Sequence, residues 1–199
     1  MGKEDMEPRG ELLPDVRELL ATDLDRYFQQ LVLSFQQRLY AFALRQTGSV
    51  QDAEDIVQEA FIRAYHALAD YPAERIRTMK LQPWLYKITL HIFYRHRSGS
   101  RLECLPLDLS EENAHLEIED DEREQPERVL EDKEELRELE TLLSRLPEQY
   151  RVAISCYYFE EMSYREIAEL LNQPIGTVKS NLHRGILLLR KTVETQQRS

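Results

Sequence analysis

Glycine, proline and cysteine are scarce in this chain of 199 residues, which has six Gly, eight Pro and two Cys. An all-β fold needs many tight turns, and Gly and Pro supply most of them, so their scarcity argues against that class. The two cysteines, Cys104 and Cys156, have no partner at metal-ligand spacing, and we expect reduced thiols rather than a disulfide. Long segments rich in Leu, Glu, Gln, Arg and Ala favour helix. We therefore predict an all-α protein.

Several signatures of other protein classes are also absent. No apolar run approaches the roughly 20 residues that cross a bilayer, and residues 1–15 lack the apolar centre of a secretory signal. We therefore expect a cytoplasmic protein without membrane insertion. The chain has no Gly-rich phosphate loop and no nucleophile elbow, and its five histidines are scattered without ligand spacing. An enzyme is thus the weaker alternative, and we expect no catalytic residue, metal, cofactor or small-molecule substrate.

Charge is segregated along the chain. The formal net charge is −11 at pH 7, which by itself argues against nucleic acid. However, residues 75–101 contain seven Lys or Arg and no acid, and residues 170–193 contain four and no acid. Between them, residues 103–128 contain eleven acids and two Arg. Two acid-free basic segments separated by an acidic one predict two anion-binding surfaces on one chain.

The apolar pattern divides the chain into two helical parts. Apolar residues recur at helical spacing from Phe28 to Phe42, and Thr47-Gly48 is expected to end this helix. The pattern resumes after Ser49, which resembles the first residue of a capping box with Asp52. A third helix is expected from Pro83 to about Arg97, after an irregular basic stretch.

Helical periodicity stops after this third helix and resumes near residue 131. The acidic segment between the two parts reads as a linker that is disordered in isolation. The predicted organisation is an N-terminal tail (1–22), a first helical domain (23–101), a flexible acidic linker (102–130) and a second helical domain (131–199).

The strongest motif is a helix-turn-helix near the C-terminus. Ser163 and Glu166 form a capping box for its first helix, and Asn172-Gln173-Pro174 forms the turn. The second helix has an apolar stripe at Val178, Leu182, Ile186 and Leu189. The alternative is a helical hairpin with a solvated polar face. The side chains left outward suit the major groove of DNA; they are Thr177, Lys179, Ser180, Asn181, His183 and Arg184.

The first basic segment has aromatic side chains among its cations. Exposed aromatics beside cations suit the binding of unpaired bases and their phosphates. The alternative is that Tyr86 and Tyr94 belong in part to the core, and we expect Trp84 to pack rather than stack. The candidate set is Arg75, Arg77, Lys80, Tyr86, Lys87, His91, Tyr94 and Arg97.

Three segments together resemble a known family. They are Asp52-Ala-Glu-Asp-Ile-Val-Gln-Glu-Ala-Phe-Ile-Arg-Ala-Tyr65, Trp84-Leu-Tyr-Lys-Ile88 and the helix-turn-helix. In this order they are similar to regions 2 and 4 of sigma factors of the extracytoplasmic-function type, the compact branch of the bacterial sigma-70 family. The likeness covers about residues 24–101 and 131–193. It implies a protein that binds core RNA polymerase, directs it to promoter DNA for transcription initiation and catalyses nothing itself.

The resemblance also implies roles for each segment. The basic residues 75–101 would hold the −10 promoter element as a single strand, and residues 175–190 would bind the −35 element as a duplex. The linker would pass towards the active-site channel of the polymerase, and an anti-sigma factor is a further partner of this family. One face of the second helix would dock on the largest polymerase subunit through Asp52, Asp55, Gln58, Glu59 and Arg63.

Some residues depart from the family pattern. His91 and Arg95 stand where members often carry Asn and Asp, and Asn181 stands where Arg is frequent. The stretch 71–82 is a few residues longer than usual. These differences concern the promoter sequence that is recognised rather than the fold. The acidity of residues 103–128 also motivates the hypothesis that the linker competes with DNA for the basic surfaces.

A stand-alone repressor or activator is the alternative from a different class. Such proteins usually dimerise to match a two-fold operator. The leucines between 136 and 146 are too short a run for a coiled coil, and this alternative leaves the acidic helix after Ser49 without a function.

Overall fold

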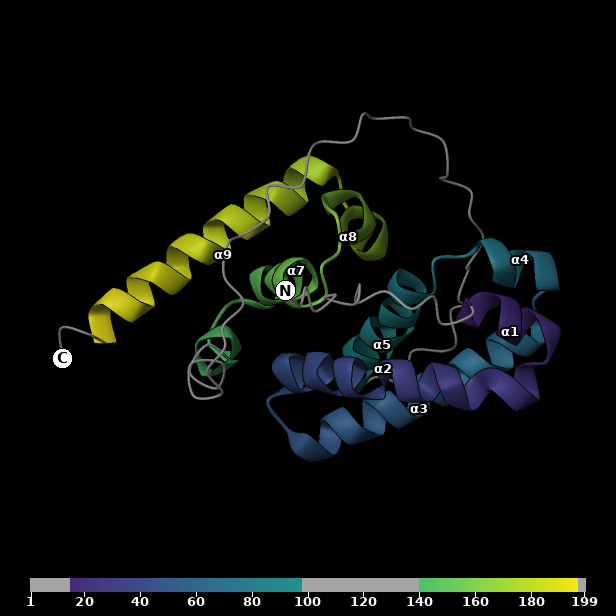
Figure 1. Ribbon diagram of the computed structural model, residues 1–199. Coiled ribbons are helices and arrows are strands. Elements are labelled where there is room, and N and C mark those ends of the chain that lie inside the picture. The colour runs from purple at the N-terminus through teal and green to yellow at the C-terminus, as the bar shows by residue number, and fades with distance from the viewer. Residues whose placement is uncertain (1–14, 98–139, 197–199) are drawn as a thin grey trace, which may run out of the picture.

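Helices build both parts of the chain that the computed structural model describes, residues 15–97 and 140–196. No strand occurs within these two ranges, which confirms the predicted all-α class. Figure 1 shows two helical units, the first running from α1 to α5 and the second from α7 to α9. The predicted linker, Cys104 and the first fourteen residues lie outside the described ranges. Within residues 15–97 and 140–196, no helix is long and apolar enough to cross a membrane.

A helical hairpin is the centre of the first unit. It joins α2 (Leu24–Thr47) to α3 (Val50–Asp70), and α5 (Leu81–Arg97) packs across both. Gly48 ends α2 in the left-handed conformation with φ 67°, which glycine adopts without strain. The side chain of Ser49 then accepts a hydrogen bond from the backbone N–H of Asp52. The predicted end of α2 at Gly48 and the predicted N-cap of α3 at Ser49 are therefore both confirmed.

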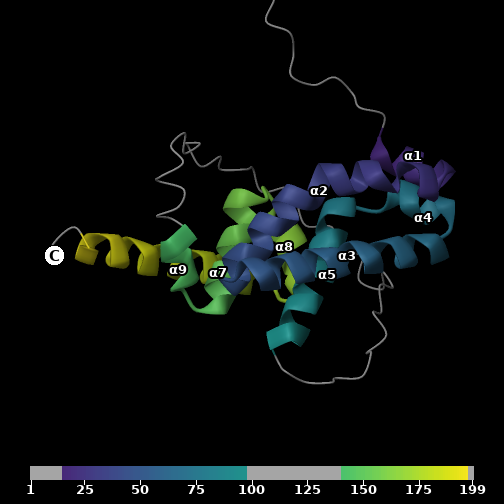
Figure 2. The same cartoon turned by 90° about the horizontal axis from the view of Figure 1, so that it is seen from below.

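Two short helices complete the first unit. Val16–Thr22 form α1 within the predicted tail, and Ala73–Thr78 form α4 within the stretch predicted to be irregular. They pack against each other, as Figures 1 and 2 both show, and Leu20 and Ile76 are buried. Helices of two turns or fewer are marginal alone and too short to show periodicity, so packing on each other and of α1 on α2 stabilises them.

The second unit contains the helix-turn-helix. It consists of α7 (Glu148–Ile154), a π-helical turn η1 (Ser155–Phe159), α8 (Tyr164–Leu171) and α9 (Ile175–Gln196), preceded by helical residues 140–144. Both hydrogen bonds of the predicted Ser163–Glu166 capping box are present. Asn172 takes the left-handed conformation with φ 49° after α8. The predicted bounds of α8 and its cap are thus confirmed.

Gly185 lets α9 approach α7 closely. A Cβ atom on this residue would lie 2.7 Å from Cδ1 of Ile154 and 3.0 Å from Cβ of Tyr150. Both distances are shorter than ordinary carbon contacts, so a side chain here would push the two helices apart. The crossing of α7 and α9 therefore depends on this glycine.

The two units are in contact, whereas the sequence predicts separate domains on a tether. Helix α8 packs against α5, and α7 packs against α2. In Figure 1 α8 lies beside the end of α5 that follows α4. The buried apolar residues of both units form one cluster. By contrast, the C-terminal half of α9 extends away from the other helices in Figures 1 and 2.

We predict that Gly185→Val lowers the free energy of unfolding by about 1–3 kcal/mol, as overpacking does in tightly packed interiors. Urea unfolding followed by circular dichroism measures the change. Gly176→Ala is the matched control, because a Cβ atom at Gly176 meets nothing within 4 Å. This control should be neutral or stabilising by at most about 1 kcal/mol, since alanine favours helix over glycine. Equal stability of Gly185→Val and the wild type would contradict the close-approach argument.

Candidate nucleic-acid interface

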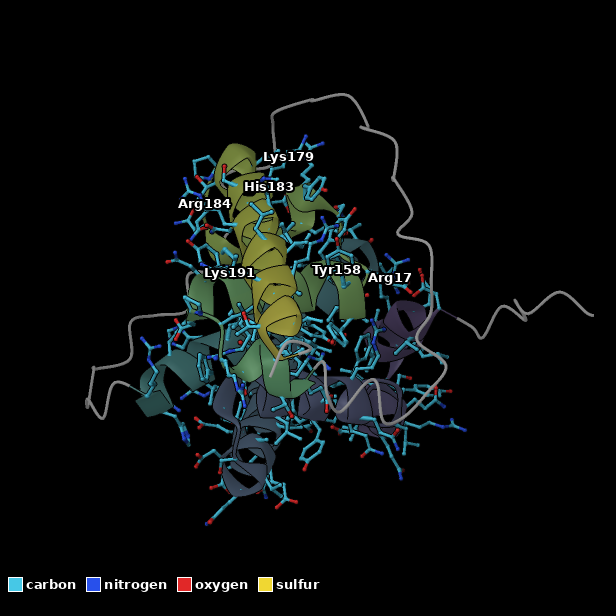
Figure 3. The ribbon with its side chains drawn as sticks, turned by 90° about the vertical axis from the view of Figure 1, so that its left-hand side faces the viewer. Arg17, Tyr158, Lys179, His183, Arg184 and Lys191 are labelled. Atoms are coloured by element: carbon cyan, nitrogen blue, oxygen red, sulfur yellow. The ribbon has the colours of Figure 1, made fainter. Side chains whose placement is uncertain are left out.

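The N-terminal half of α9 presents an exposed polar face. Thr177, Lys179, Ser180, His183 and Arg184 are all exposed. Figure 3 shows three of the labelled side chains, those of Lys179, His183 and Arg184, along this part of the helix. The Nζ atom of Lys179 lies 5.3 Å from the ring centre of Tyr164 on α8. Short polar groups with flanking cations on a protruding helix suit contacts to base edges and phosphates.

Asn181 does not belong to this exposed face. Its residue is 8% exposed, so the prediction that its side chain points outward is wrong. Asn181 lies three residues after Val178 and four before Gly185, which places all three on the side of α9 that faces the unit's interior. Ile186 and Leu189, predicted to belong to the apolar stripe, are only half-buried. The buried face is thus rotated towards Asn181 relative to the predicted stripe.

The predicted single-strand surface on α4 and α5 has most of its cations paired. Arg77 bonds to Glu18 at 3.1 Å and to Glu74 at 2.6 Å, and the Arg75 guanidinium lies 3.8 Å from the Tyr71 ring centre. Two further cations bond to acids of the second unit: Lys80 to Glu166 at 3.1 Å, and Arg97 to Glu148.

The other members of this predicted set differ in exposure. Lys87 is exposed and Tyr94 is 38% exposed, whereas His91 is half-buried. Burial and then the nearby Arg63 and Arg95 lower the pKa of His91, which favours its neutral form. Lys87 and Tyr94 thus offer an exposed cation and a partly exposed ring on the same helix.

Tyr86 is a core residue, which is the alternative that the sequence left open, and not an exposed stacking ring. It is fully buried, and its ring packs edge-to-face on Phe42 with centres 4.9 Å apart. Its hydroxyl donates a hydrogen bond to the carboxylate of Glu160 in the second unit. Burial and then the charge of Glu160 raise the pKa of Tyr86 well above its usual range, so the phenol stays protonated. Trp84 is buried as predicted.

Only part of the predicted polymerase-binding face of α3 is exposed. Asp52, Asp55 and Gln58 are exposed, whereas Glu59 and Arg63 are half-buried. Glu59 accepts hydrogen bonds from Arg63, at 2.8 Å, and from Arg95 on α5. Partial burial acts to raise the pKa of Glu59, but these two hydrogen bonds outweigh it and the pKa lies below its ordinary value. Glu59 thus ties α3 to α5, and only the first three residues are fully open to a partner.

The sequence did not predict a buried cluster of charged and polar side chains centred on Glu160. This carboxylate is buried between the units, where it bonds to Arg45 at 2.6 Å and lies 3.4 Å from Arg38. Nothing in the sequence distinguishes Glu160 from its exposed neighbour Glu161. The one available signal is the spacing of Arg38 and Arg45, which at seven residues apart share a face of α2.

Neither cysteine chemistry nor a metal site is evident in the described ranges. Cys156 is a free, fully buried thiol, and burial raises its pKa. No group of His, Cys, Asp and Glu side chains in residues 15–97 and 140–196 could hold a metal ion.

Both helical units match models of known protein families. The family model "Sigma-70 region 2" matches residues 31–102, and "Sigma-70, region 4" matches residues 136–189. The ECF RNA polymerase sigma factor SigW of Bacillus subtilis is 33% identical over 168 residues, which is 82% of this chain and 87% of that protein. The ECF RNA polymerase sigma factor SigE of Mycolicibacterium smegmatis is 33% identical over 166 residues, and the match spans only 60% of that longer protein.

A solved structure shares the fold. The sigma factor RpoE in complex with the anti-sigma factor NepR from Bartonella quintana matches with a TM-score of 0.60 and 23% identity. The match covers 84% of this chain and 96% of that one. The arrangement of helices therefore extends over nearly the whole of the solved chain.

We predict that Glu59→Arg lowers the free energy of unfolding by about 1 kcal/mol or more, because it places a third cation beside Arg63 and Arg95 and removes their shared acceptor. Asp55→Arg, on the same helix but exposed, is the matched control and should change stability by less than about 0.5 kcal/mol. Urea unfolding of both variants measures the difference. Equal stability of the two variants would show that the Glu59 bonds contribute nothing to the packing of α3 on α5.

Proposed function

Because the chain belongs to the extracytoplasmic-function sigma factors of the sigma-70 family, we propose that it binds core RNA polymerase and directs it to specific promoters. The observation that carries this function is the order of the two units. A region 2 bundle comes first, and a region 4 helix-turn-helix with an exposed, acid-free α9 face follows. The polymerase supplies the chemistry of RNA synthesis, and this chain supplies the choice of promoter.

In this proposal the exposed side of α3 docks on the polymerase. Asp52, Asp55 and Gln58 are exposed and available to a partner surface. Glu59 and Arg63 support that surface from within through their mutual bond. A row of exposed acidic and amide groups on a rigid helix suits a basic or polar partner.

The two DNA-binding surfaces in the proposal are α4–α5 and α9. On α5, Lys87 and Tyr94 offer a cation and a ring to the −10 element as a single strand. Around them, Arg75, Arg77, Lys80, His91 and Arg97 would hold phosphates once their present partners are displaced. On α9 the exposed polar face would enter the major groove of the −35 element. Its members are Thr177, Lys179, Ser180, His183 and Arg184.

An anti-sigma factor is a further partner in the proposal. Support comes from the likeness of fold to the Bartonella sigma factor, which was solved with such a factor bound.

Transcription from fragmented host DNA tests the function directly. The purified chain is added to bacterial core RNA polymerase, and the 5′ ends of the transcripts are sequenced. We expect new starts that share −10 and −35 elements and that are absent without the chain. Failure to form a stable polymerase complex, with any bound inhibitor removed, would reject the proposal in favour of a stand-alone DNA-binding protein.

Asp55→Arg should weaken the complex with core polymerase at least about ten-fold, because it reverses the charge at a docking position. Equilibrium binding of labelled chain to core polymerase measures the loss. Glu169→Arg is the control, since it makes the same reversal at an exposed residue of α8 outside the docking face. Equal affinities for the two variants would reject docking through α3.

Arg184→Ala should weaken binding to −35 duplex DNA about ten-fold, as expected for loss of one base or phosphate contact. The duplex is taken from a promoter found in the transcription experiment, and fluorescence anisotropy measures the affinity. Lys191→Ala removes an exposed cation further along the same helix, as Figure 3 shows, and should have a smaller effect. An equal loss in both variants would indicate general charge attraction rather than a defined contact.

A further inference from the structure

Three tyrosine rings lie in contact where η1 joins α8. The rings of Tyr157 and Tyr164 are stacked, with an angle of 3° between their planes and centres 4.9 Å apart. The ring of Tyr158 meets Tyr157 edge-on, with centres 5.0 Å apart. Tyr157 and Tyr164 are half-buried, whereas Tyr158 is exposed. Ring pairs at this separation attract each other beyond the burial of their area, so Tyr157 braces the ring of Tyr164.

The link from η1 to α8 folds the chain so that these rings meet. Glu161 in this link has a φ of 53°, in the left-handed region that residues other than glycine seldom adopt. The next residue, Met162, is buried, and its backbone N–H donates to a backbone oxygen of η1 at 3.0 Å. Ser163 then caps α8, and Tyr164 is the first residue of that helix. A sharp reversal thus returns the chain to η1 and places Tyr164 on Tyr157.

The same Tyr164 ring lies beside a cation of α9. The Nζ atom of Lys179 is 5.3 Å from the ring centre, within the roughly 6 Å over which a cation is attracted to an aromatic face. Lysine carries its charge on a flexible four-carbon stem, and an ordered position costs it side-chain entropy. A ring that already restrains the ammonium reduces the entropy that is lost when the group binds a partner.

Lys179 belongs to the exposed face of α9 that is proposed to enter the −35 duplex. Figure 3 shows it near the N-terminal end of α9, ahead of His183 and Arg184. Residues near the start of a recognition helix lie closest to the base edges, and an ammonium there is a compact donor for a base or a phosphate. The ring of Tyr164 therefore restrains a charge at the part of α9 where contact with DNA is closest.

We propose that Tyr164 is a positioning residue for recognition of the −35 element: its ring, braced by Tyr157, holds the Lys179 ammonium in the orientation that binds the duplex. The inference rests on the proposed function, because that function gives α9 a duplex to bind. Tyr164 acts through Lys179 and needs no contact with DNA of its own. Loss of the ring therefore weakens binding only while Lys179 is present.

A double-mutant cycle on the full chain tests this coupling. Fluorescence anisotropy measures binding to a duplex that carries the −35 element found by the transcription experiment. Lys179→Ala should weaken binding about ten-fold, and Tyr164→Leu about three-fold, the loss expected for one exposed cation–π contact. The double variant should bind about as weakly as Lys179→Ala alone, because the ring then has no cation to hold. Losses that multiply in the double variant would overturn the proposal.

Two matched variants separate positioning from a general effect on the fold. Tyr164→Phe keeps the aromatic face and should bind within about two-fold of the wild type. Arg184→Ala changes a cation five residues further along α9, about 140° away around the helix, so its loss should multiply with that of Tyr164→Leu. Equal coupling of Tyr164 to Arg184 and to Lys179 would show that the ring supports α9 as a whole, which would overturn the proposal.

A measurement on the wild-type chain covers the case in which Tyr164→Leu does not fold by circular dichroism. Protons held over an aromatic face resonate upfield. NMR of chain with labelled lysine should therefore show the Lys179 Cε protons upfield of those of Lys191, an exposed lysine of the same helix. Lys179→Arg assigns the signal by its loss. A Lys179 signal at the position of the Lys191 signal would also overturn the proposal.

Failure of the proposed function has a different signature. A wild-type chain that binds the −35 duplex no better than a scrambled duplex would reject the role of α9 in promoter recognition, and the positioning role of Tyr164 with it. Selective binding with multiplying losses, by contrast, keeps the function and rejects only the positioning role.

Discussion

One buried carboxylate determines how the two halves of this chain sit together. No apolar side chain could replace Glu160, since its oxygens contact the guanidinium groups of Arg45 and Arg38 and the phenol of Tyr86 at once. A buried charge tolerates few arrangements, because any shift that loses a partner leaves another charge unpaired in a dry environment. Apolar packing between α8 and α5 could slide with little loss, whereas this cluster fixes a single register. The bonds of Glu160 thus add a defined register to the apolar packing between region 2 and region 4.

The structure changes how the segregation of charge along the sequence is interpreted. The sequence motivates competition between the acidic linker and DNA, but that linker lies outside the described residues. Acids of the folded second unit contact basic groups of the first unit, among them Glu148, Glu160 and Glu166. None of the three lies in an acidic run like that of residues 103–128. Because charge runs record local composition only, they could not reveal pairings between residues about 50 to 115 positions apart.

Local rules predicted most of the helices but not the exposure of single residues. The capping box at Ser163, the stop at Gly48 and the packing of Trp84 follow from neighbours within four residues, and the structure confirms them. The burial of Asn181 and Tyr86 depends on which helices cross nearby, and an amphipathic pattern locates a buried face only to within about one residue spacing. Likewise the short helices α1 and α4 depend on packing against each other and of α1 against α2.

Tyr86 shows why burial decides which aromatic residues of α5 can meet a base. Its hydroxyl bonds to Glu160 of the second unit. Its ring packs on Phe42 within the first unit. Neither its hydroxyl nor its ring is therefore free to contact an unpaired base. A stacking platform for unpaired bases must come from another residue, and Tyr94 on the same helix already has its ring partly in solvent.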